Sequence, residues 1–309
     1  MEKKFISIVA YLHNAENNIV NFLDTVIGVC QSNYEKLEVI LVNDACEDGT
    51  MEQIRKYMEN HPQNMMVNVV HMSCFQGLES AMNAGRDIAI GDFVYEFDDI
   101  LVDYSPEVVL KAYQELIKGY DIVSVKSCGK NRLTSRMFYA LFNKTSCGTA
   151  KIGPETFRII SRRAINRVRT IGQYIPYRKA MYMNCGLKAT TIAYDSTNQN
   201  IRVKNSTIIS ERTDLAIDSF IYFTNALERI SAIISGVFLL ITILVGVYII
   251  ADFFSQDKIV EGWVSTMGFM AMGFFGVFVL LTIILKYLSV LINLIFKQQR
   301  YLVADIEKL

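Results

Sequence analysis

Residues 37–50 read LEVILVNDACEDGT, an unbroken apolar run that ends in a cluster of polar residues. Such a run is typical of a strand that is buried on both faces of a parallel sheet. Two similar stretches, FISIVAYLHN at 5–14 and DFVYEFDD at 92–99, also pass from apolar to polar residues. Because the carboxyl ends of parallel strands meet at one edge of a sheet, we expect these polar residues to surround a ligand crevice.

The pattern up to residue 97 alternates between short apolar strands and amphipathic helices. We predict strands at 5–11, 37–42, 66–71 and 92–97, and helices at 15–31, 49–60 and 78–90. In the first helix the apolar residues recur at the spacing of one helical face: Ile19, Phe22, Leu23, Val26 and Ile27. The alternation predicts an α/β fold, with a mostly parallel, Rossmann-like sheet and helices on both of its faces.

Charge and cysteine content restrict the class of protein. The 309 residues carry 31 basic and 31 acidic side chains, a balance that gives no reason to expect a nucleic-acid partner. The six cysteines show no CxxC spacing, which disfavours a zinc knuckle or a disulfide framework. The first residues, MEKKFISIVAYLHN, do not form a secretory signal, so we expect the N-terminal domain in the cytoplasm.

Two long apolar runs, at 230–251 and 262–285, carry no charged residue. Each is long enough for a helix that crosses a hydrocarbon core of roughly 30 Å. Their length disfavours the alternative of a helical pair inside a soluble domain. Arg229 and Lys286 flank the pair on its outer sides, which predicts a transmembrane hairpin with both termini on the cytoplasmic side of the inner membrane.

The expected organisation therefore has four parts. A cytosolic domain at 1–209 is followed by an amphipathic helix at 210–229, which we expect to lie among the lipid headgroups. The hairpin occupies 230–285, and a juxtamembrane helix and tail occupy 286–309. Basic residues at Lys126, Arg132 and Arg136 precede an aromatic-bearing helix, where they would meet a lipid phosphate or, more generally, anionic headgroups.

Four stretches in order carry a resemblance to a known family: SIVAYLHNAENN at 7–18, VNDACEDGT at 42–50, QGLESAMNAGRDIAIGDFVYEFDD at 76–99 and TFRIISRR at 156–163. They resemble family 2 glycosyltransferases of the GT-A fold. With the apolar C-terminal region, the chain is similar to polyprenyl-phosphate glycosyltransferases, among them the dolichol-phosphate mannose synthases. The resemblance implies an inverting hexosyl transfer from a nucleotide-diphosphate sugar to a polyprenyl phosphate, such as undecaprenyl phosphate, and a homotetramer.

Two alternatives to this function remain open. In the first, the acceptor is a lipid-linked glycan in capsule or cell-wall assembly. In the second, the chain is a catalytically weakened scaffold subunit that binds a nucleotide sugar.

The resemblance also implies a donor-binding set. Asp44 would accept hydrogen bonds from the base or ribose. The other residues of this set are Tyr11, His13, Asn14, Gly77, Asn83, Arg202 and Ser206. Helix packing is an alternative role for Gly77 and Asn83, because small residues let a helix approach its neighbours. For Arg202 and Ser206, expected to close over the donor phosphates, the alternative is a linker that begins near residue 196.

Asp98 and Asp99 would hold Mg²⁺ or Mn²⁺ against the donor diphosphate, since hard cations prefer carboxylate oxygens. The family pattern is Asp-x-Asp, so in this chain the second carboxylate is either displaced to Asp99 or missing. Neighbouring strand residues face opposite ways, and the two can chelate jointly only if the strand ends before them. The alternative for Asp99 and Asp103 is to cap the helix that follows.

Two residues in the fourth stretch complete the candidate catalytic set. Glu155 would be a general base, although the family usually has the acidic residue at the position of Thr156. Arg158 would orient a phosphate, because its planar fork suits bidentate contact, or it would form a structural ion pair. A lipid phosphate is already anionic at neutral pH, so its attack needs a base less than attack by a sugar hydroxyl does.

Overall fold

The computed structural model describes residues 2–60, 65–128, 139–140, 143, 152–171, 177–196, 262–296 and 301–309, with scattered residues between 233 and 247. The chain divides into two compact units, one of residues 1–216 with 298–309 and one of residues 217–297. Each unit is described separately below.

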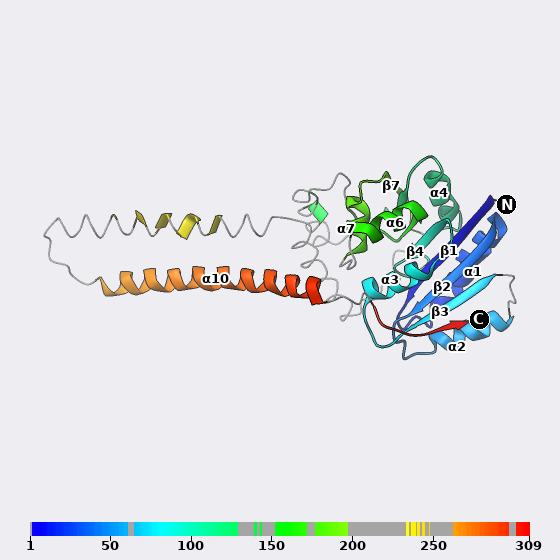
Figure 1. Cartoon of the computed structure of the whole chain (residues 1–309), viewed down its shortest axis with the longest axis horizontal. Helices are drawn as coiled ribbons and strands as arrows, with labels where there is room; N and C mark the ends of the chain where they lie inside the picture. The colour runs from blue at the N-terminus through cyan, green and yellow to red at the C-terminus, as the bar shows by residue number, and fades with distance from the viewer. Residues whose placement is uncertain are drawn as a thin grey trace. The chain divides into compact units, whose positions relative to one another are not determined.

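The first unit is built on one sheet of eight strands (Figure 1). Four strands form its parallel centre: β1 (Glu2–Leu12), β2 (Tyr34–Asn43), β3 (Met66–Met72) and β4 (Phe93–Phe97). The other four are β5 (Ile122–Ser127), β6 (Phe157–Ser161), β7 (Ala189–Tyr194) and β8 (Val303–Lys308). The strand order is β7-β5-β6-β4-β1-β2-β3-β8.

The sheet is mixed: its centre is parallel, as the sequence predicts, but two of its other strands run antiparallel to their neighbours. β6 runs antiparallel to both β4 and β5, and β8 runs antiparallel to β3. The predicted alternation covered only the first four strands, all of which are present within a few residues of their predicted bounds. Strand direction in the second half depends on connections for which the sequence shows no periodic signal.

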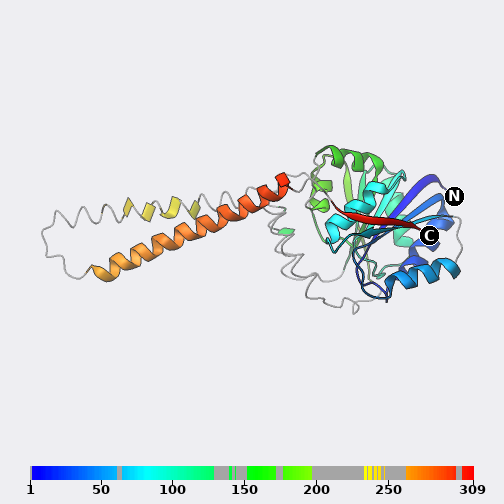
Figure 2. The ribbon, with the colours of Figure 1, turned by 60° about the horizontal axis from the view of Figure 1, so that its bottom comes forward.

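Helices cover both faces of the sheet, as the sequence predicts (Figures 1 and 2). On one face, α1 (Ile19–Asn33), α2 (Thr50–Asn60) and α4 (Glu107–Leu116) bury their apolar residues against the sheet in the main core. On the other, α3 (Leu78–Ile88) lies so close that a Cβ at Gly85 would clash with Val9 and Val42. That face also carries α6 (Arg162–Ile171) and α7 (Arg178–Asn184).

The last strand of the sheet comes from residues that follow both apolar runs. β8, drawn in red in Figure 2, extends the sheet beyond β3, and Val70 pairs with Ile306. Glu307 accepts hydrogen bonds from Arg55 of α2 (3.0 Å) and His71 of β3 (3.0 Å). The sequence pattern predicts a juxtamembrane helix and tail at 286–309, so this strand is a feature that the pattern does not indicate.

The second unit contains one long described helix, α10 (Trp263–Phe296). The helix runs without a break through the second apolar run and most of the segment predicted as a separate juxtamembrane helix. Many of its apolar side chains are exposed, among them Phe275 (68%) and Phe278 (66%). Within the described part of the chain, no helix qualifies by length and hydropathy together as a membrane-crossing segment.

Candidate active site

Asp44 lies at the carboxyl edge of the sheet, directly after β2, and its side chain is fully buried. Its backbone N–H donates to Leu12 O at the end of β1 (2.9 Å). The carboxylate accepts hydrogen bonds from Gln76 N (2.8 Å), Gly77 N (2.9 Å) and the Tyr11 hydroxyl (3.0 Å). The structure thus joins three predicted donor-binding residues, Tyr11, Asp44 and Gly77. A carboxylate accepts about four hydrogen bonds, so most of the capacity of Asp44 is used to hold the loop before α3.

His13 and Asn14 connect the loops that follow β1 and β2. His13 Nδ1 lies 2.8 Å from Asp44 O, and its ring contacts Phe75 with a centroid distance of 4.6 Å. Asn14 has a left-handed φ of 51°, which asparagine tolerates better than most residues, and its Oδ1 accepts a hydrogen bond from Glu47 N (2.9 Å). Phe75 is 42% exposed, so an accessible aromatic ring lies beside His13.

Gly77 and Asn83 both belong to the α3 region, but only Gly77 is seen to contact Asp44. Gly77 begins the helix with φ of 80°, a conformation that favours glycine, and this places its N–H against Asp44. Asn83 is buried, and its Oδ1 has no hydrogen-bond partner among the described residues. Arg202 and Ser206 lie outside the described residues, as do Arg132 and Arg136.

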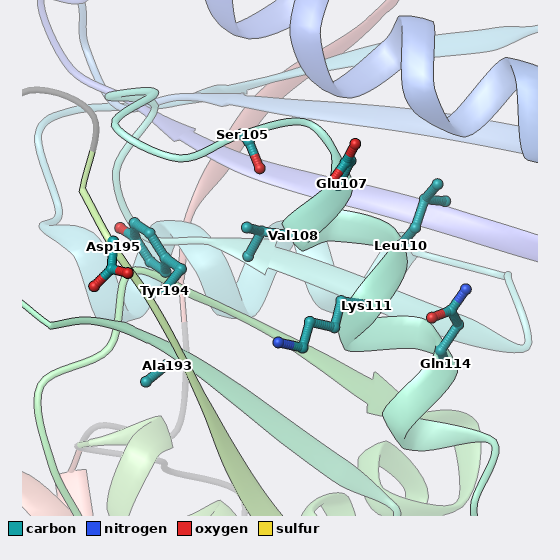
Figure 3. Close-up of a pocket in the computed structure, with 9 residues that line it drawn as sticks. All are labelled: Ser105, Glu107, Val108, Leu110, Lys111, Gln114, Ala193, Tyr194 and Asp195. Carbon is teal, nitrogen blue, oxygen red and sulfur yellow. The ribbon is translucent and has the colours of Figure 1, made fainter.

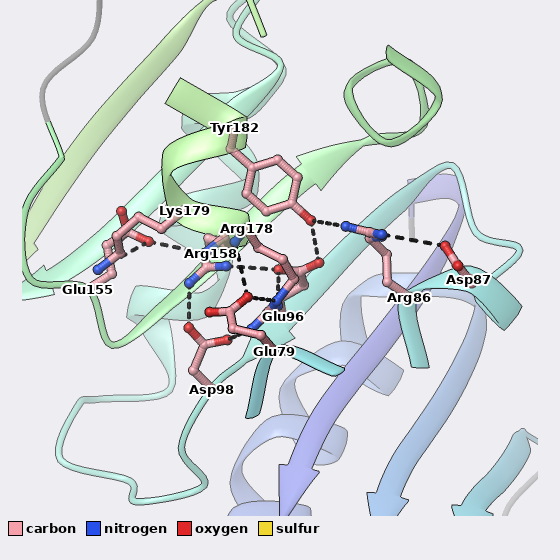
Figure 4. A network of polar contacts seen from close by, with 10 residues as sticks. All are labelled: Glu79, Arg86, Asp87, Glu96, Asp98, Glu155, Arg158, Arg178, Lys179 and Tyr182. Carbon is pink, nitrogen blue, oxygen red and sulfur yellow. Dashed lines mark hydrogen bonds and ion pairs between the residues drawn. The ribbon is translucent and has the colours of Figure 1, made fainter. Parts of the chain in front are cut away.

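A buried network of acidic and basic side chains lies at the end of β4 (Figure 4). Its centre is Glu96, one residue before the end of the strand and fully buried. Glu96 Oε2 accepts from Arg158 Nη1 of β6 (3.0 Å) and Arg178 Nη1 of α7 (2.7 Å). Glu96 Oε1 accepts from the Tyr182 hydroxyl (2.6 Å). These contacts join β4, β6 and α7.

Asp98 lies two residues beyond Glu96 and is bound by the same two arginines. Arg178 Nη2 donates to Asp98 Oδ1 (2.8 Å), and Arg158 Nη2 donates to Asp98 Oδ2. Burial alone would raise the pKa of Asp98, but the charges of Arg158 and Arg178 outweigh it and hold that pKa well below its usual range. The Asp98 side chain keeps 22% exposure, whereas Glu96 is completely buried.

Two further carboxylates belong to this network. Glu79 of α3 accepts hydrogen bonds from Arg178 Nε (2.9 Å) and from the backbone N–H of Arg178 (3.0 Å). Glu155 accepts from Arg158 Nε (3.0 Å), and Lys179 Nζ lies 3.9 Å from it. The Glu155 side chain is only 3% exposed. The candidate general base is therefore held in a buried ion pair, and Arg158 forms the structural ion pairs that were its alternative role.

Asp99 does not join Asp98 as a second metal ligand, which corrects the predicted metal pair. Asp99 is exposed, and its Oδ1 accepts a hydrogen bond from Leu101 N (3.0 Å) in the loop after β4. Asp98 instead faces the two arginines (Figure 4). Among the residues that the structure describes, no group of three or more acidic, histidine or cysteine side chains is arranged to hold a metal ion. The donor set at Asp98 and Asp99 therefore does not fit Mg²⁺ or Mn²⁺.

Asp103, for which the sequence left helix capping as the alternative, contacts the end of β7. It is buried and accepts hydrogen bonds from the Tyr194 hydroxyl (2.5 Å) and Ser196 Oγ (3.1 Å). Asp103 therefore ties the loop after β4 to the end of β7. The N-cap residue of α4 is Pro106, which makes no side-chain capping hydrogen bond.

A separate pocket of about 630 Å³ lies between α4 and the end of β7 (Figure 3). Charged lining residues include Glu107, Lys111 and Asp195. None of the predicted site residues lines it. We therefore place the candidate site at the ends of β1, β2 and β4 rather than in this pocket.

Several members of the site are absent from the set predicted from the sequence: Phe75, Glu79, Glu96, Arg178 and Tyr182. One of them had a readable signal, because Glu96 is an acidic residue within an apolar strand and shares a strand face with Asp98 two positions later. Arg178 had none, since its partners Glu79 and Asp98 are 99 and 80 positions away in the chain.

Known proteins resemble the chain in sequence. An uncharacterised glycosyltransferase of Synechocystis is 27% identical over 198 residues, which cover 62% of the chain but only 60% of that relative. The putative glycosyltransferase CsbB of Bacillus subtilis is 25% identical over 279 residues, covering 87% of the chain and 80% of CsbB. A prophage bactoprenol glucosyl transferase homolog of Escherichia coli is 25% identical over 270 residues, covering 85% and 86% respectively.

The fold is similar to that of solved glycosyltransferase structures. Glucosyl-3-phosphoglycerate synthase from Mycobacterium tuberculosis, solved in complex with uridine diphosphate, superposes with a TM-score of 0.51 at 14% identity. The superposition covers 71% of the chain and 79% of that enzyme. The sheet of the first unit, with helices on both faces, is accordingly of the GT-A type.

The sequence pattern of the family described as "Glycosyl transferase family 2" matches residues 7–185. This match covers more than half of the chain and includes Asp44, Glu96, Asp98 and Arg158, the residues around which the candidate site is built. The chain therefore belongs to glycosyl transferase family 2.

Proposed function

We propose that the chain transfers a hexose from a nucleotide-diphosphate sugar to a polyprenyl phosphate at the cytoplasmic surface of the inner membrane. The observation that carries this proposal is the grouping of Tyr11, His13, Asp44 and Gly77 at the carboxyl edge of a GT-A sheet. Bound ligands of α/β sheets lie at this edge. The relatives named as bactoprenol glucosyl transferases support the lipid acceptor.

The loop around Asp44 supplies the site for the nucleoside. His13 and the exposed ring of Phe75 form an aromatic surface beside it, on which a base can stack. Asp44 fixes the loop that carries Phe75 through Gln76 N and Gly77 N. Because its side chain is fully buried, Asp44 supports nucleoside binding by positioning this loop and its aromatic ring.

The reaction is a single displacement. A phosphate oxygen of the lipid attacks the anomeric carbon, the bond from that carbon to the diphosphate oxygen breaks, and the nucleoside diphosphate leaves with the bonding electrons. No proton has to be removed from an anionic phosphate, so the burial of Glu155 in an ion pair is compatible with this step. One displacement inverts the anomeric configuration.

The membrane attachment is supported by the sequence of the second unit. The runs at 230–251 and 262–285 are uncharged, and α10 exposes large apolar side chains such as Phe275 and Phe278 along its length. Exposed apolar surface on this scale is costly in water and favourable against lipid. We propose that this unit holds the first unit at the lipid surface, where the acceptor phosphate is found.

Glycolipid synthesis by the full chain tests the proposal. The detergent-purified protein is incubated with undecaprenyl phosphate and, one at a time, UDP- and GDP-sugars, and products are identified by mass spectrometry. We expect one nucleotide sugar to give a hexosyl-phosphoryl-undecaprenol. We also expect D44N to weaken binding of that nucleotide about tenfold or more, since a lost charge-assisted hydrogen bond costs about 1.5–3 kcal/mol.

The matched control is D24N, which makes the same change at an exposed position on α1. It should bind the nucleotide as the wild type does. D98N should fold and enter the membrane fraction but lose turnover, and near-normal turnover would remove Asp98 from the catalytic assignment.

A second candidate function is favoured by the ion pairs that hold both Asp98 and Glu155. In this alternative the chain binds a nucleotide sugar but serves as a scaffold subunit in glycan assembly. Donor binding that D44N weakens, without product from any donor or lipid acceptor, would support the scaffold and contradict transfer. Product formation on a lipid-linked glycan alone would support the other alternative acceptor.

A further inference from the structure

Every carboxylate oxygen of Glu96 and Asp98 already has a donor within the protein. Glu96 Oε1 accepts from Tyr182 (2.6 Å), and Glu96 Oε2 accepts from both Arg158 (3.0 Å) and Arg178 (2.7 Å). Asp98 Oδ1 accepts from Arg178 (2.8 Å), and Asp98 Oδ2 accepts from Arg158. A divalent cation that bound these oxygens would share them with two guanidinium groups, which stay positively charged at any pH at which the protein is folded.

The arginines themselves are not free to move away. The Arg178 side chain is completely buried, and its Nε, Nη1 and Nη2 contact Glu79, Glu96 and Asp98 respectively. Arg158 is 2% exposed and contacts Glu155, Glu96 and Asp98 in the same way. Displacing either group would leave several buried carboxylates without a counter-charge, which strongly disfavours the displacement.

The charge of the cluster is close to balanced before any ion is added. Four carboxylates, those of Glu79, Glu96, Asp98 and Glu155, face three cationic side chains, those of Arg158, Arg178 and Lys179. A divalent cation placed among them would lie close to two fixed positive charges. Like charges at this distance and burial repel strongly, because the surrounding dielectric is low.

We propose that Arg158 and Arg178 are built-in counter-cations for the Glu96–Asp98 carboxylate pair, and that this site therefore does not take a divalent metal ion. The negative charge of the two carboxylates is offset by these two side chains. The inference about metal binding rests on these contacts alone. If the chain is a transferase as proposed, the inference implies that transfer does not require Mg²⁺ or Mn²⁺. This consequence also rests on the proposed function.

Mn²⁺ binding to the full-length, detergent-purified protein tests the inference without any need for activity. Free Mn²⁺ is measured by electron paramagnetic resonance during titration of the wild type and of D98N, each with and without UDP. We expect the two proteins to give the same Mn²⁺ binding curve in each condition. A binding component present in the wild type and lost in D98N, in either condition, would overturn the inference.

Removal of one counter-cation should open the site. R178Q leaves the Glu96–Asp98 pair with one guanidinium, and we expect it to bind Mn²⁺ at least about tenfold more tightly than the wild type. Mn²⁺ should also raise the Tm of R178Q but not that of the wild type. The matched control is R169Q, which removes a more exposed arginine that pairs with Asp87 (3.0 Å), and it should bind Mn²⁺ as the wild type does.

R178Q also removes the main partner of buried Glu79, so its folding is checked by circular dichroism. If it does not fold, R158Q takes its place, because it removes the other guanidinium from the Glu96–Asp98 pair and should also bind Mn²⁺ more tightly than the wild type. Unchanged Mn²⁺ binding by a folded R178Q or R158Q would contradict the role of the two arginines as counter-cations.

The transfer assay separates this inference from the proposed function. Product formed at an equal rate in excess EDTA and in Mn²⁺ would support both. Product formed in Mn²⁺ but abolished by EDTA would overturn the metal-independent reaction while confirming transfer. Absence of product in all conditions would count against the proposed function, and the Mn²⁺ titration would then decide the metal inference alone.

Discussion

Asp98 has an ionisation state that is set by its neighbours rather than by its exposure. Although 22% of its side chain is accessible, two buried guanidinium groups contact its two oxygens. The charged form is therefore favoured at every pH near neutrality. Asp98 thus contributes to folding as a paired carboxylate, and this contribution has a defined pH dependence.

We predict that the stability difference between the wild type and D98N depends on pH in one direction. The pKa of Asp98 is lower in the folded chain than the unfolded value of about 3.9, so ionised Asp98 stabilises the fold above that pH. The difference should be constant between about pH 5 and 8, at about 2 kcal/mol, and should shrink as the pH falls below about 4. Urea unfolding across this range measures it.

The control for this series is D24N, whose exposed carboxylate should give a difference near zero at all pH values. A D98N difference that stays constant down to about pH 3 would show that the two arginines do not depress the Asp98 pKa.

Among single residues, the sequence predicted polar residues that follow strands, but it missed Glu96, which lies within one. Asp44, His13 and Asp98 were identified because polar residues after apolar strands mark the sheet edge. Glu96 was overlooked because it interrupts a strand instead of following one. The ion pairs of Asp98 could not be predicted, because they depend on the distance between β4 and α7, which no local pattern encodes.

At the scale of elements, β8 is tied to the loop that holds Asp44. The Gln76 side chain donates to Leu302 O (2.6 Å) and accepts from Leu302 N (2.8 Å), just before β8 begins. The Gln76 backbone N–H donates to Asp44 Oδ1 (2.8 Å). One residue therefore links the last strand of the sheet to the candidate donor site.

We predict that Q76A loosens β8 and weakens nucleotide binding together. Its loss of two hydrogen bonds should lower the free energy of unfolding by about 1–3 kcal/mol. Amide hydrogen exchange should accelerate in 303–308 and in the loop at 73–77 more than in β1. The Q76A backbone can still donate to Asp44, but its side chain no longer holds residue 302. The loop at 73–77, which belongs to the candidate donor site, and β8 therefore become more mobile together.

The matched control is Q114A, which truncates an exposed glutamine on α4 and should leave exchange in β8 unchanged. Protection of 303–308 that is the same in Q76A and the wild type would show that the ladder with β3 holds β8 without Gln76.

The sequence predicted β1 to β4 because each shows a local pattern with a polar end. β8 was missed because VADIEK, at 303–308, has few apolar residues and its partner β3 lies more than two hundred positions earlier. The backbone of β3 and the contacts of Glu307 with Arg55 and His71 determine this strand. Long-range pairing of this kind leaves little trace in periodicity.

Within the second unit, Gly276 of α10 contacts Phe238 in the first apolar run, and a Cβ at this position would clash with the Phe238 ring. Gly273, one turn earlier, has nothing within 4 Å of a Cβ. We predict that G276A lowers the Tm of the detergent-solubilised chain, because the phenylalanine ring must move. G273A should leave it unchanged or raise it, since alanine favours a helix over glycine by about 1 kcal/mol.

These two variants make the same chemical change three residues apart. Equal Tm values for G276A and G273A would contradict a packed pair formed by the two apolar runs.

At the scale of the whole molecule, the chain combines a GT-A unit with a unit whose apolar side chains are exposed. The first contains the candidate donor site at the carboxyl edge of its sheet, and the second has a surface that water does not favour. The sequence predicted this division from its apolar runs. It did not predict that residues after the second run return to the sheet of the first unit.

We predict that the full chain behaves as an integral membrane protein. In a bacterial host it should stay in the pellet after an alkaline carbonate wash and be released only by detergent, because about 20 uncharged residues in each run favour the hydrocarbon core. Release by carbonate would contradict insertion of the two runs.

The same preparation tests the orientation. Cys74, which is exposed in the first unit, should react with an impermeant maleimide only after spheroplasts are lysed, and C74S identifies its signal. Labelling of Cys74 in intact spheroplasts would place the first unit outside the cell.

The position of β8 in the chain sets an order of events during biosynthesis. Its residues leave the ribosome after both apolar runs, so the β3 edge of the nascent first unit stays uncovered until those runs have been synthesised. An open strand edge is a site for mispairing with other chains. A truncated chain that ends before the apolar runs would lack β8, so its β3 edge would stay uncovered. Co-expression of residues 301–309 as a separate peptide would supply the missing strand.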